Sequence, residues 1–163
     1  MGKPLRERKA SKPGRAVENR QCKLRFSLPA MERFLRKLNR ELGLPHGSAF
    51  VCFVTDAEMK RLNAQFRRNP KTTDVLSFPS AVRTRPKSLA VRVRQLGGEF
   101  LGDIAISPAV ARRNAKTGKR TLPKEICILM LHGVLHLLGY DHETDRGEME
   151  CVEATLRRRL GLT

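Results

Sequence analysis

Three of the four histidines lie close together in the sequence, in the stretch HGVLHLLGYDH that ends at position 142. His132 and His136 are four residues apart, and the apolar residues around them predict a helix on which both rings project from one face. Gly139 stands where that helix should end, and glycine readily adopts the left-handed conformation that reverses a chain. We expect this reversal to bring His142 back toward the other two imidazoles.

Three converging imidazoles are typical of a metal site. No fourth ligand follows nearby in the sequence, which fits an open catalytic zinc site better than a closed structural one. On ligand type, zinc is favoured over iron, nickel and copper. A histidine pair on an apolar helix is often only packed in the core, but a third histidine after a glycine turn is harder to explain in that way. We therefore expect His132, His136 and His142 to bind one Zn²⁺ ion.

The same spacing is the ligand frame of the metzincin peptidases, which place a glutamate directly after the first histidine as general base. Gly133 occupies that position here. Without the carboxylate, a peptidase lacks the group that carries a proton from the attacking water to the leaving amine. The sequence therefore has the ligand frame of these enzymes and disfavours their chemistry.

The charge of the chain indicates its class of partner. Its 163 residues include 33 Lys and Arg against 16 Asp and Glu, a net charge of +17. Nucleic acid is the commonest polyanion that such a chain binds. Charge alone leaves open a merely soluble basic surface or attraction to anionic lipid. The longest apolar run, from Ile126 to Leu131, is far shorter than the ~20 residues that a membrane span needs.

Four cysteines lie far apart and form no C-x-x-C pair: Cys22, Cys52, Cys127 and Cys151. Each stands in an apolar stretch, so we expect four buried, reduced thiols and a reducing compartment. The first residues lack the apolar core of a secretory signal. These features favour the cytoplasm.

The elements that must position the histidines follow from the hydrophobic pattern. We expect an α+β (mixed α/β) fold, in which a small mixed sheet of about four strands packs with about five helices in a single domain. Residues 1–20 are predicted to be a basic, disordered arm and residues 21–163 the folded domain. The predicted strands are 22–28, 49–54, 74–79 and 102–107. In the long segment 80–101, the alternation of Leu89, Val91 and Val93 with polar residues predicts an extra hairpin.

Three motifs in this order, TTDVLSFP, FLGDIAIS and HGVLHLLGYDH, closely resemble the YbeY family of bacterial rRNA maturation factors. The resemblance covers about residues 21–160. It implies a single-domain, zinc-dependent endoribonuclease with a fold distantly similar to metalloproteases, including the zinc helix. It also implies a role in small-subunit rRNA 3′-end processing and in ribosome quality control. The implied partners are rRNA or the small ribosomal subunit, a ribosomal protein and a ribosome-associated GTPase, with no membrane.

The resemblance also assigns residues. The three motif histidines become metal ligands, with His136 and Arg67 as catalytic residues, and Asp103 becomes a contact for a ribosomal protein. By its residue type alone, Arg67 would be an ordinary surface arginine beside Arg68.

Two carboxylates near the motifs are candidates for orienting an imidazole, a common arrangement around metal-bound histidines. They are Asp74 and Asp141, although Asp141 could equally cap the last helix or lie in solvent. Two functions stay open at this point. One is a zinc-dependent, single-strand-specific endoribonuclease, and the other is a non-catalytic ribosome-assembly or RNA-binding factor with a structural metal.

Overall fold

The computed structural model describes residues 15–81, 88–96 and 98–163, and these residues form four strands and six helices. The strands are β1 (Val17–Asn19), β2 (Ala49–Phe53), β3 (Val75–Pro79) and β4 (Gly102–Ile106). They form one mixed sheet in the order β1-β2-β4-β3, in which β3 is an antiparallel edge strand and the other pairs are parallel. The predicted α+β class with a four-stranded mixed sheet is confirmed.

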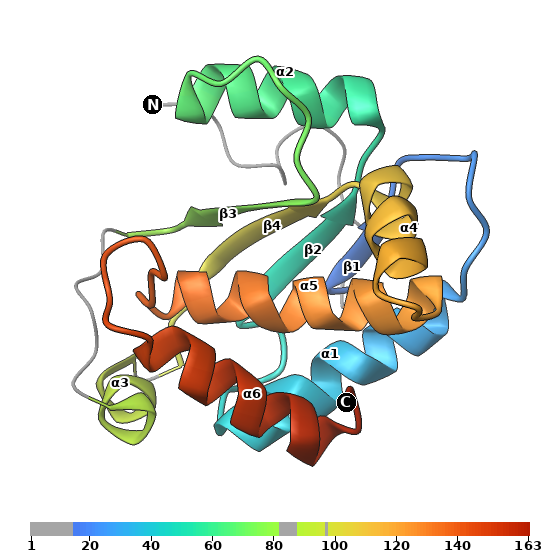
Figure 1. Ribbon diagram of the computed structural model, residues 1–163. Coiled ribbons are helices and arrows are strands. Elements are labelled where there is room, and N and C mark those ends of the chain that lie inside the picture. The colour runs from blue at the N-terminus through green and yellow to red at the C-terminus, as the bar shows by residue number, and fades with distance from the viewer. Residues whose placement is uncertain (1–14, 82–87, 97) are drawn as a thin grey trace.

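The helices alternate with these strands along the first two thirds of the chain and then follow one another (Figure 1). They are α1 (Leu28–Leu42), α2 (Asp56–Arg67), α3 (Leu89–Leu96), α4 (Pro108–Thr117), α5 (Leu122–Leu137) and α6 (Glu148–Leu160). Four of the described helices begin after a serine or threonine whose side chain accepts a hydrogen bond from a backbone N–H of the first turn. Ser27, Thr55, Ser107 and Thr121 are these caps.

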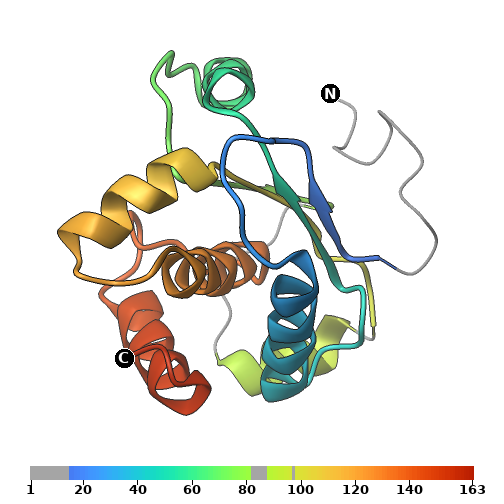
Figure 2. The same ribbon diagram turned by 90° about the vertical axis from the view of Figure 1, so that its right-hand side faces the viewer.

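Helix α5 runs across one face of the sheet and is the central helix on that side (Figures 1 and 2). Alternate residues of β2 and β4 face it, among them Val51, Phe53, Ile104 and Ile106, and all four are fully buried. The outer side of α5 is covered by α1 and α6. Because α5 is apolar nearly all round its circumference, it must be enclosed in this way.

The opposite face of the sheet packs against α2. Phe50, Cys52 and Ala105 alternate with the residues that face α5, and they meet Met59 and Leu62 of α2 in a second, smaller apolar cluster. This arrangement buries β2 on both faces, as its uninterrupted apolar run predicts. The sheet therefore separates a large core on the α5 side from a small one on the α2 side.

The predicted first strand is wrong, and so is the start of the folded domain. Residues 22–28 form no strand, because the side chain of Gln21 takes over local backbone bonding: it accepts from the N–H of Leu24 and donates to the carbonyl of Leu24, both at 2.9 Å. The strand lies earlier, at Val17–Asn19, within the predicted arm, where it pairs in parallel with β2. Residues 1–14, the rest of that arm, lie outside the described residues.

The hairpin expected between residues 80 and 101 is also wrong where the structure describes it, since residues 89–96 form α3. The spacing of Leu89, Val93 and Leu96 fits one face of a helix as well as the alternation fits a strand, and these three residues reach the large core. Residues 82–87 lie outside the described part.

Two of the four cysteines depart from the expectation. Cys52 and Cys127 are buried, and burial raises the pKa of each thiol to about 12, which makes both unreactive. Cys22 and Cys151 are exposed, because one lies in the irregular segment before α1 and the other on the outer side of α6. None of the described helices is long and apolar enough to cross a bilayer.

Candidate metal centre

A close contact between α5 and the sheet positions the candidate metal site. A Cβ atom added at Gly133 would lie 2.9 Å from Cγ2 of Ile104, so glycine lets the helix approach β4 more closely than any other residue could. On the edge strand, the hydroxyl of Ser77 donates to the carbonyl of Gly133 at 3.1 Å. These contacts place the last turns of α5 beneath β3.

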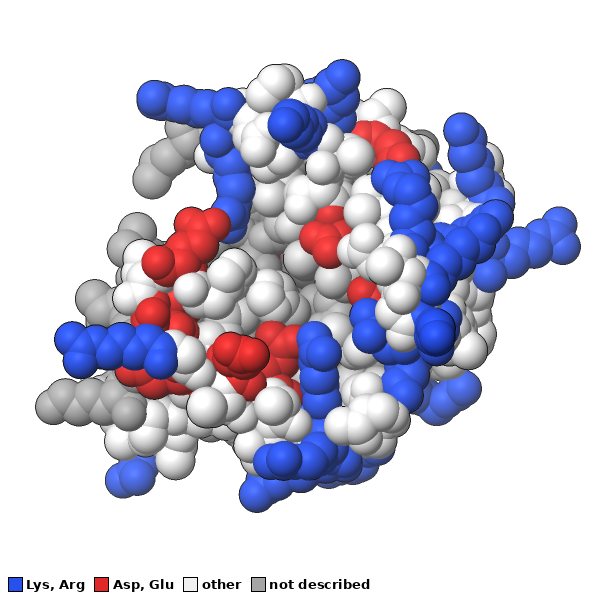
Figure 3. Space-filling view, viewed as in Figure 1, with Lys and Arg blue, Asp and Glu red and all other residues white. Residues whose placement is uncertain are grey.

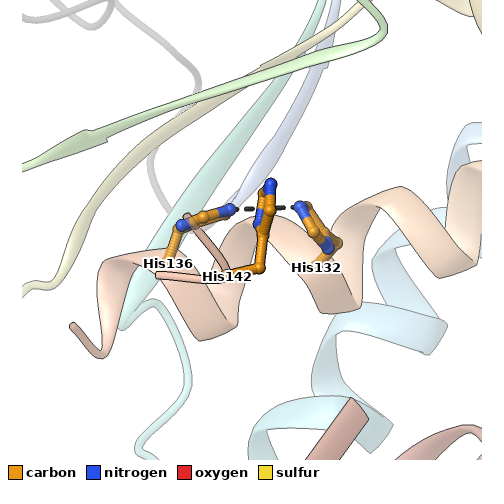
Figure 4. Close-up of side chains that lie close together, drawn as sticks. All are labelled: His132, His136 and His142. Atoms are coloured by element: carbon orange, nitrogen blue, oxygen red, sulfur yellow. Dashed lines mark hydrogen bonds between the residues drawn. The ribbon is translucent and has the colours of Figure 1, made fainter. Parts of the chain in front are cut away.

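His132 and His136 project from this part of α5 toward the same point, as their spacing predicts (Figure 4). Their Nε2 atoms are 3.1 Å apart, and their ring centroids are 4.7 Å apart. Both side chains are partly buried, so the pair lies at the floor of an opening rather than inside the core.

The third histidine arrives through the predicted turn. Helix α5 ends at Leu137, and Gly139 has a φ of +95°, the left-handed conformation that reverses the chain. The N–H of Tyr140 donates to the carbonyl of Leu135 at 3.1 Å and closes the turn. The ring of His142 then lies 5.4 Å from that of His132 and 5.2 Å from that of His136.

One ligand nitrogen from each of the three histidines lies within 4.8 Å of the others. Tetrahedral zinc with Zn–N bonds of ~2.1 Å separates its ligand nitrogens by about 3.4 Å, so the cluster needs only a modest contraction to bind such an ion. A three-histidine set also leaves a coordination position open. The residues therefore fit a metal ion, and the prediction that the three imidazoles lie close together is confirmed.

Glu153 of α6 is a functional residue that the sequence analysis missed. Its carboxylate is 2.9 Å from Nδ1 of His132, the nitrogen on the far side of the ring from the cluster, and it also binds Arg157. Burial opposes the charge on Glu153, but its bonds with His132 and Arg157 outweigh that effect and lower the pKa of the carboxyl. A negative acceptor at Nδ1 fixes the proton there and leaves Nε2 free to bind a metal.

His136 is held in the neutral form that a metal ligand requires. Burial, together with the neighbouring His132 and His142, lowers its pKa to about 4. A hydrogen bond with the backbone of Tyr140 acts in the opposite direction and is weaker. At neutral pH the ring can therefore bind a cation without first releasing a proton.

This centre lies in a chain whose residues 16–161 match the profile of the endoribonuclease YbeY family. The chain belongs to the YbeY family. An endoribonuclease YbeY from Solibacter usitatus is 45% identical over 154 residues, which cover 94% of this chain and 92% of the relative. Another, from Koribacter versatilis, is 41% identical over 133 residues, covering 82% and 77%. The family predicted from the three motifs is confirmed, and with it the enzyme class.

A solved structure supports the fold. The solution structure of TM1509 from Thermotoga maritima superposes with a TM-score of 0.56 at 27% identity, and the match covers 88% of each chain.

Arg67, the residue that the YbeY resemblance nominates, lies in the last turn of α2, above the histidines. Its side chain is 54% exposed, and its guanidinium is 4.0 Å from the carboxylate of Glu143, the neighbour of His142. The structure thus brings Arg67 near the metal centre, through its ion pair with the residue after His142. Its catalytic role stays a prediction.

The two aspartates that were expected to orient an imidazole are bonded elsewhere. Asp74 accepts from the amide of Asn114 at 3.0 Å and from the N–H of Val75 at 2.8 Å. Asp141 accepts from the N–H of Glu143 and from the hydroxyl of Thr144, so it shapes the loop after the turn. Among the hydrogen bonds of the described residues, those of both carboxylates go to groups of their own loop or of α4, so the orienting role stays a prediction for both. Glu153 takes the expected role for His132.

Asp103 does not have the exposed position that the YbeY resemblance implied. It lies in β4, between Phe50 of β2 and Phe78 of β3, and only 2% of it is exposed. A residue on the inner strand of a sheet is covered by its neighbours on both sides, which explains the burial. The contact of Asp103 with a ribosomal protein has no support from its position.

The surface around the centre is divided by charge. Figure 3 shows a hollow between α2 and α5, with acidic side chains gathered along one side and basic ones above and opposite. The segment after the turn contributes exposed acids, among them Glu143, Glu148 and Glu150. The exposed cations include Arg67 and Arg68 at the end of α2 and Arg112, Arg113 and Lys116 of α4.

Proposed function

We propose that this protein is a zinc-dependent endoribonuclease that cleaves single-stranded ribosomal RNA. The observation that carries the proposal is the convergence of three histidine nitrogens within 4.8 Å at the hollow, in a chain of the YbeY family. The large excess of positive charge supports a polyanionic substrate.

Zinc is the metal that this ligand set favours. When bound, zinc supplies a Lewis acid that activates water at neutral pH and stabilises charge on a phosphoryl group. Three neutral imidazoles leave the charge of the ion uncompensated, which suits an anionic phosphodiester. Gly133 lies against Ile104, in the position where a peptidase of similar frame has its general base. That packing supports phosphodiester rather than peptide chemistry.

Residues of the chain itself prepare the site. Glu153 fixes the tautomer and the direction of the His132 ring. Arg67, at the exposed rim, can turn from Glu143 to the scissile phosphate and bind two of its oxygens through its planar guanidinium. The acids beside the cluster repel phosphate, so the RNA strand is expected to enter from the side of α2.

The biological setting is part of the same proposal. We infer that the protein acts in the cytoplasm on the small ribosomal subunit, in 3′-end maturation of its RNA and in ribosome quality control. A ribosomal protein and a ribosome-associated GTPase are the proposed protein partners. This setting follows from the YbeY family and from the basic charge of the chain.

The test is cleavage of a small-subunit rRNA precursor by purified protein freed of contaminating nuclease. We expect His136→Ala to lose at least 100-fold of the cleavage rate, since it removes one of three ligands. The matched control is His46→Ala, which changes an exposed histidine outside the cluster that pairs with Glu32. Equal cleavage by both variants contradicts the proposal.

The same experiment separates the enzyme from an assembly factor with a structural metal. Chelated protein should keep its circular dichroism spectrum and lose cleavage. If chelation unfolds the protein, and the metal-loaded protein binds the precursor without cutting it, the metal is structural.

A further inference from the structure

Phe66 is the large apolar side chain that stays exposed in the described part of the chain, with a relative accessibility of 42%. It lies in the last turn of α2, directly before Arg67. Single exposed apolar residues are common on protein surfaces, so exposure alone assigns no role. The way in which this ring is held, and the charges around it, say more.

The ring of Phe66 is fixed by the edge strand. It packs edge-to-face on Phe78 of β3, with ring centroids 4.9 Å apart and an interplanar angle of 70°. Phe78 in turn packs against the smaller apolar cluster beneath α2. The Phe66 ring is thus anchored on one side and open on another. A ring that is already ordered loses little conformational entropy when a flat ligand stacks on it.

The end of α2 is strongly basic. Between Glu58 and Asp74 the sequence has no acid, and five exposed cations lie in this interval: Lys60, Arg61, Arg67, Arg68 and Lys71. An aromatic ring among cations is the combination with which proteins bind single-stranded nucleic acid, since the ring stacks with a base and the cations contact phosphates.

The ring also lies near the catalytic centre. Arg67, the next residue, reaches Glu143, and Glu143 follows the histidine that completes the cluster. Strand β3, against which Phe66 packs, also contributes the Ser77 hydroxyl that holds α5 at Gly133. Ser77 and Phe78 point to opposite faces of β3, so the ring and the metal centre lie on either side of the edge strand, and Arg67 links the two sides through Glu143.

We propose that Phe66 is a base-stacking platform, on which one base of single-stranded RNA lies while Arg67 and Arg68 contact the adjoining phosphates. This inference rests on the proposed function. It explains how the protein would select single-stranded over double-stranded RNA. In a duplex, neighbouring bases cover one another's faces, and no base is available for the ring. Because every base has a stackable face, the platform confers little sequence preference.

A fluorescent variant tests the contact directly. The chain has no tryptophan, so Phe66→Trp introduces a single indole at the platform. The metal-loaded variant is titrated in the cold with a single-stranded oligoribonucleotide, and the integrity of the RNA is checked on a gel. We expect the single strand to quench the indole fluorescence and a duplex of the same sequence to leave it unchanged. The matched control is Ala64→Trp, an exposed site two residues earlier and about 200° around α2. Equal quenching of both variants, or none for Phe66→Trp, overturns the inference.

Affinity gives the second readout. Phe66→Ala should weaken single-stranded RNA binding by about 5- to 150-fold, and Phe66→Tyr should keep it, because only the alanine removes the stacking face. Zinc content should be unchanged in both. If the wild-type protein neither binds nor cleaves single-stranded RNA, the proposed function itself fails. If the wild-type protein does both and Phe66→Ala binds as tightly, only the platform is wrong.

Discussion

The two walls of the hollow are built by different means. On the wall formed by α5 and α6, the histidines are partly buried, Glu153 fixes one ring, and a glycine brings the helix against the sheet. On the wall formed by α2, Phe66 and Arg67 are exposed, and the ion pair of Arg67 with Glu143 spans 4.0 Å between two solvated side chains. Such pairs contribute little stability.

The difference indicates a division of labour. A metal centre must hold its ligands within a few tenths of an ångström, which requires packing and buried hydrogen bonds. A wall that receives a flexible, charged polymer needs side chains that can move to meet it. We therefore expect substitutions on the α5–α6 wall to change metal affinity and stability, and substitutions on the α2 wall to change RNA binding and turnover without changing either.

The largest effect that tests this division should come from Glu153. Glu153→Ala removes the acceptor at Nδ1 of His132 and should weaken zinc binding by about 10- to 100-fold, with Glu153→Gln in between. Competition with a chromophoric chelator measures the affinity, and ¹⁵N chemical shifts of the His132 ring report its tautomer. Glu150→Ala, an exposed change on the same helix, is the control. If Glu153→Ala changes neither the zinc affinity nor the His132 tautomer, the carboxylate does not orient this ligand.

Gly133 should come next, through stability. A methyl group there would meet Ile104 at 2.9 Å, so Gly133→Ala should lower the free energy of unfolding by about 1–3 kcal/mol. Urea denaturation of the metal-free protein measures this change. If the paired substitution Ile104→Ala restores none of the loss, the contact is not its cause.

On the α2 wall, Arg67→Lys keeps the charge and loses the planar guanidinium. We expect about a tenfold slower cleavage of single-stranded RNA with zinc affinity and unfolding free energy unchanged, because one bidentate bond to phosphate becomes a single one. Arg61→Lys, on the same helix, is the control. A drop in zinc affinity for Arg67→Lys would contradict the division between the walls.

A separate effect should be the contribution of His136 to acid sensitivity. Its folded-state pKa of about 4 lies below the ordinary value of 6.5, so as the pH falls the unfolded chain takes up a proton first. The stabilisation is complete above pH ~6.5 and is lost toward pH 4. The metal-free protein should therefore lose unfolding free energy across this window more steeply than His136→Gln. Identical slopes would show that the ring titrates normally.

The parts of the structure that could be predicted from the sequence are those encoded by local pattern. The ligand helix, its glycine turn and the return of His142 follow from spacings within eleven residues. Hydrophobic period also predicts β2, β3 and β4 close to their observed places.

The remaining features depend on contacts between distant segments. Glu153 reaches His132 from another helix, and no spacing within α6 distinguishes it from the other acids of that segment. The short strand β1 exists because it pairs with β2, more than thirty residues later, and its three residues are too few to show a strand pattern of their own. In α3, helix and strand periods fit the same apolar residues, and packing on the core decided between them.

Metal content and turnover, measured together on one preparation, test the central claim most directly. We predict one zinc ion per chain, loss of RNA cleavage when a chelator removes it, and recovery when zinc is restored to the folded protein. An open three-histidine site holds a single ion. Cleavage at full rate by protein that contains less than about 0.1 zinc ion per chain would contradict a zinc-dependent mechanism.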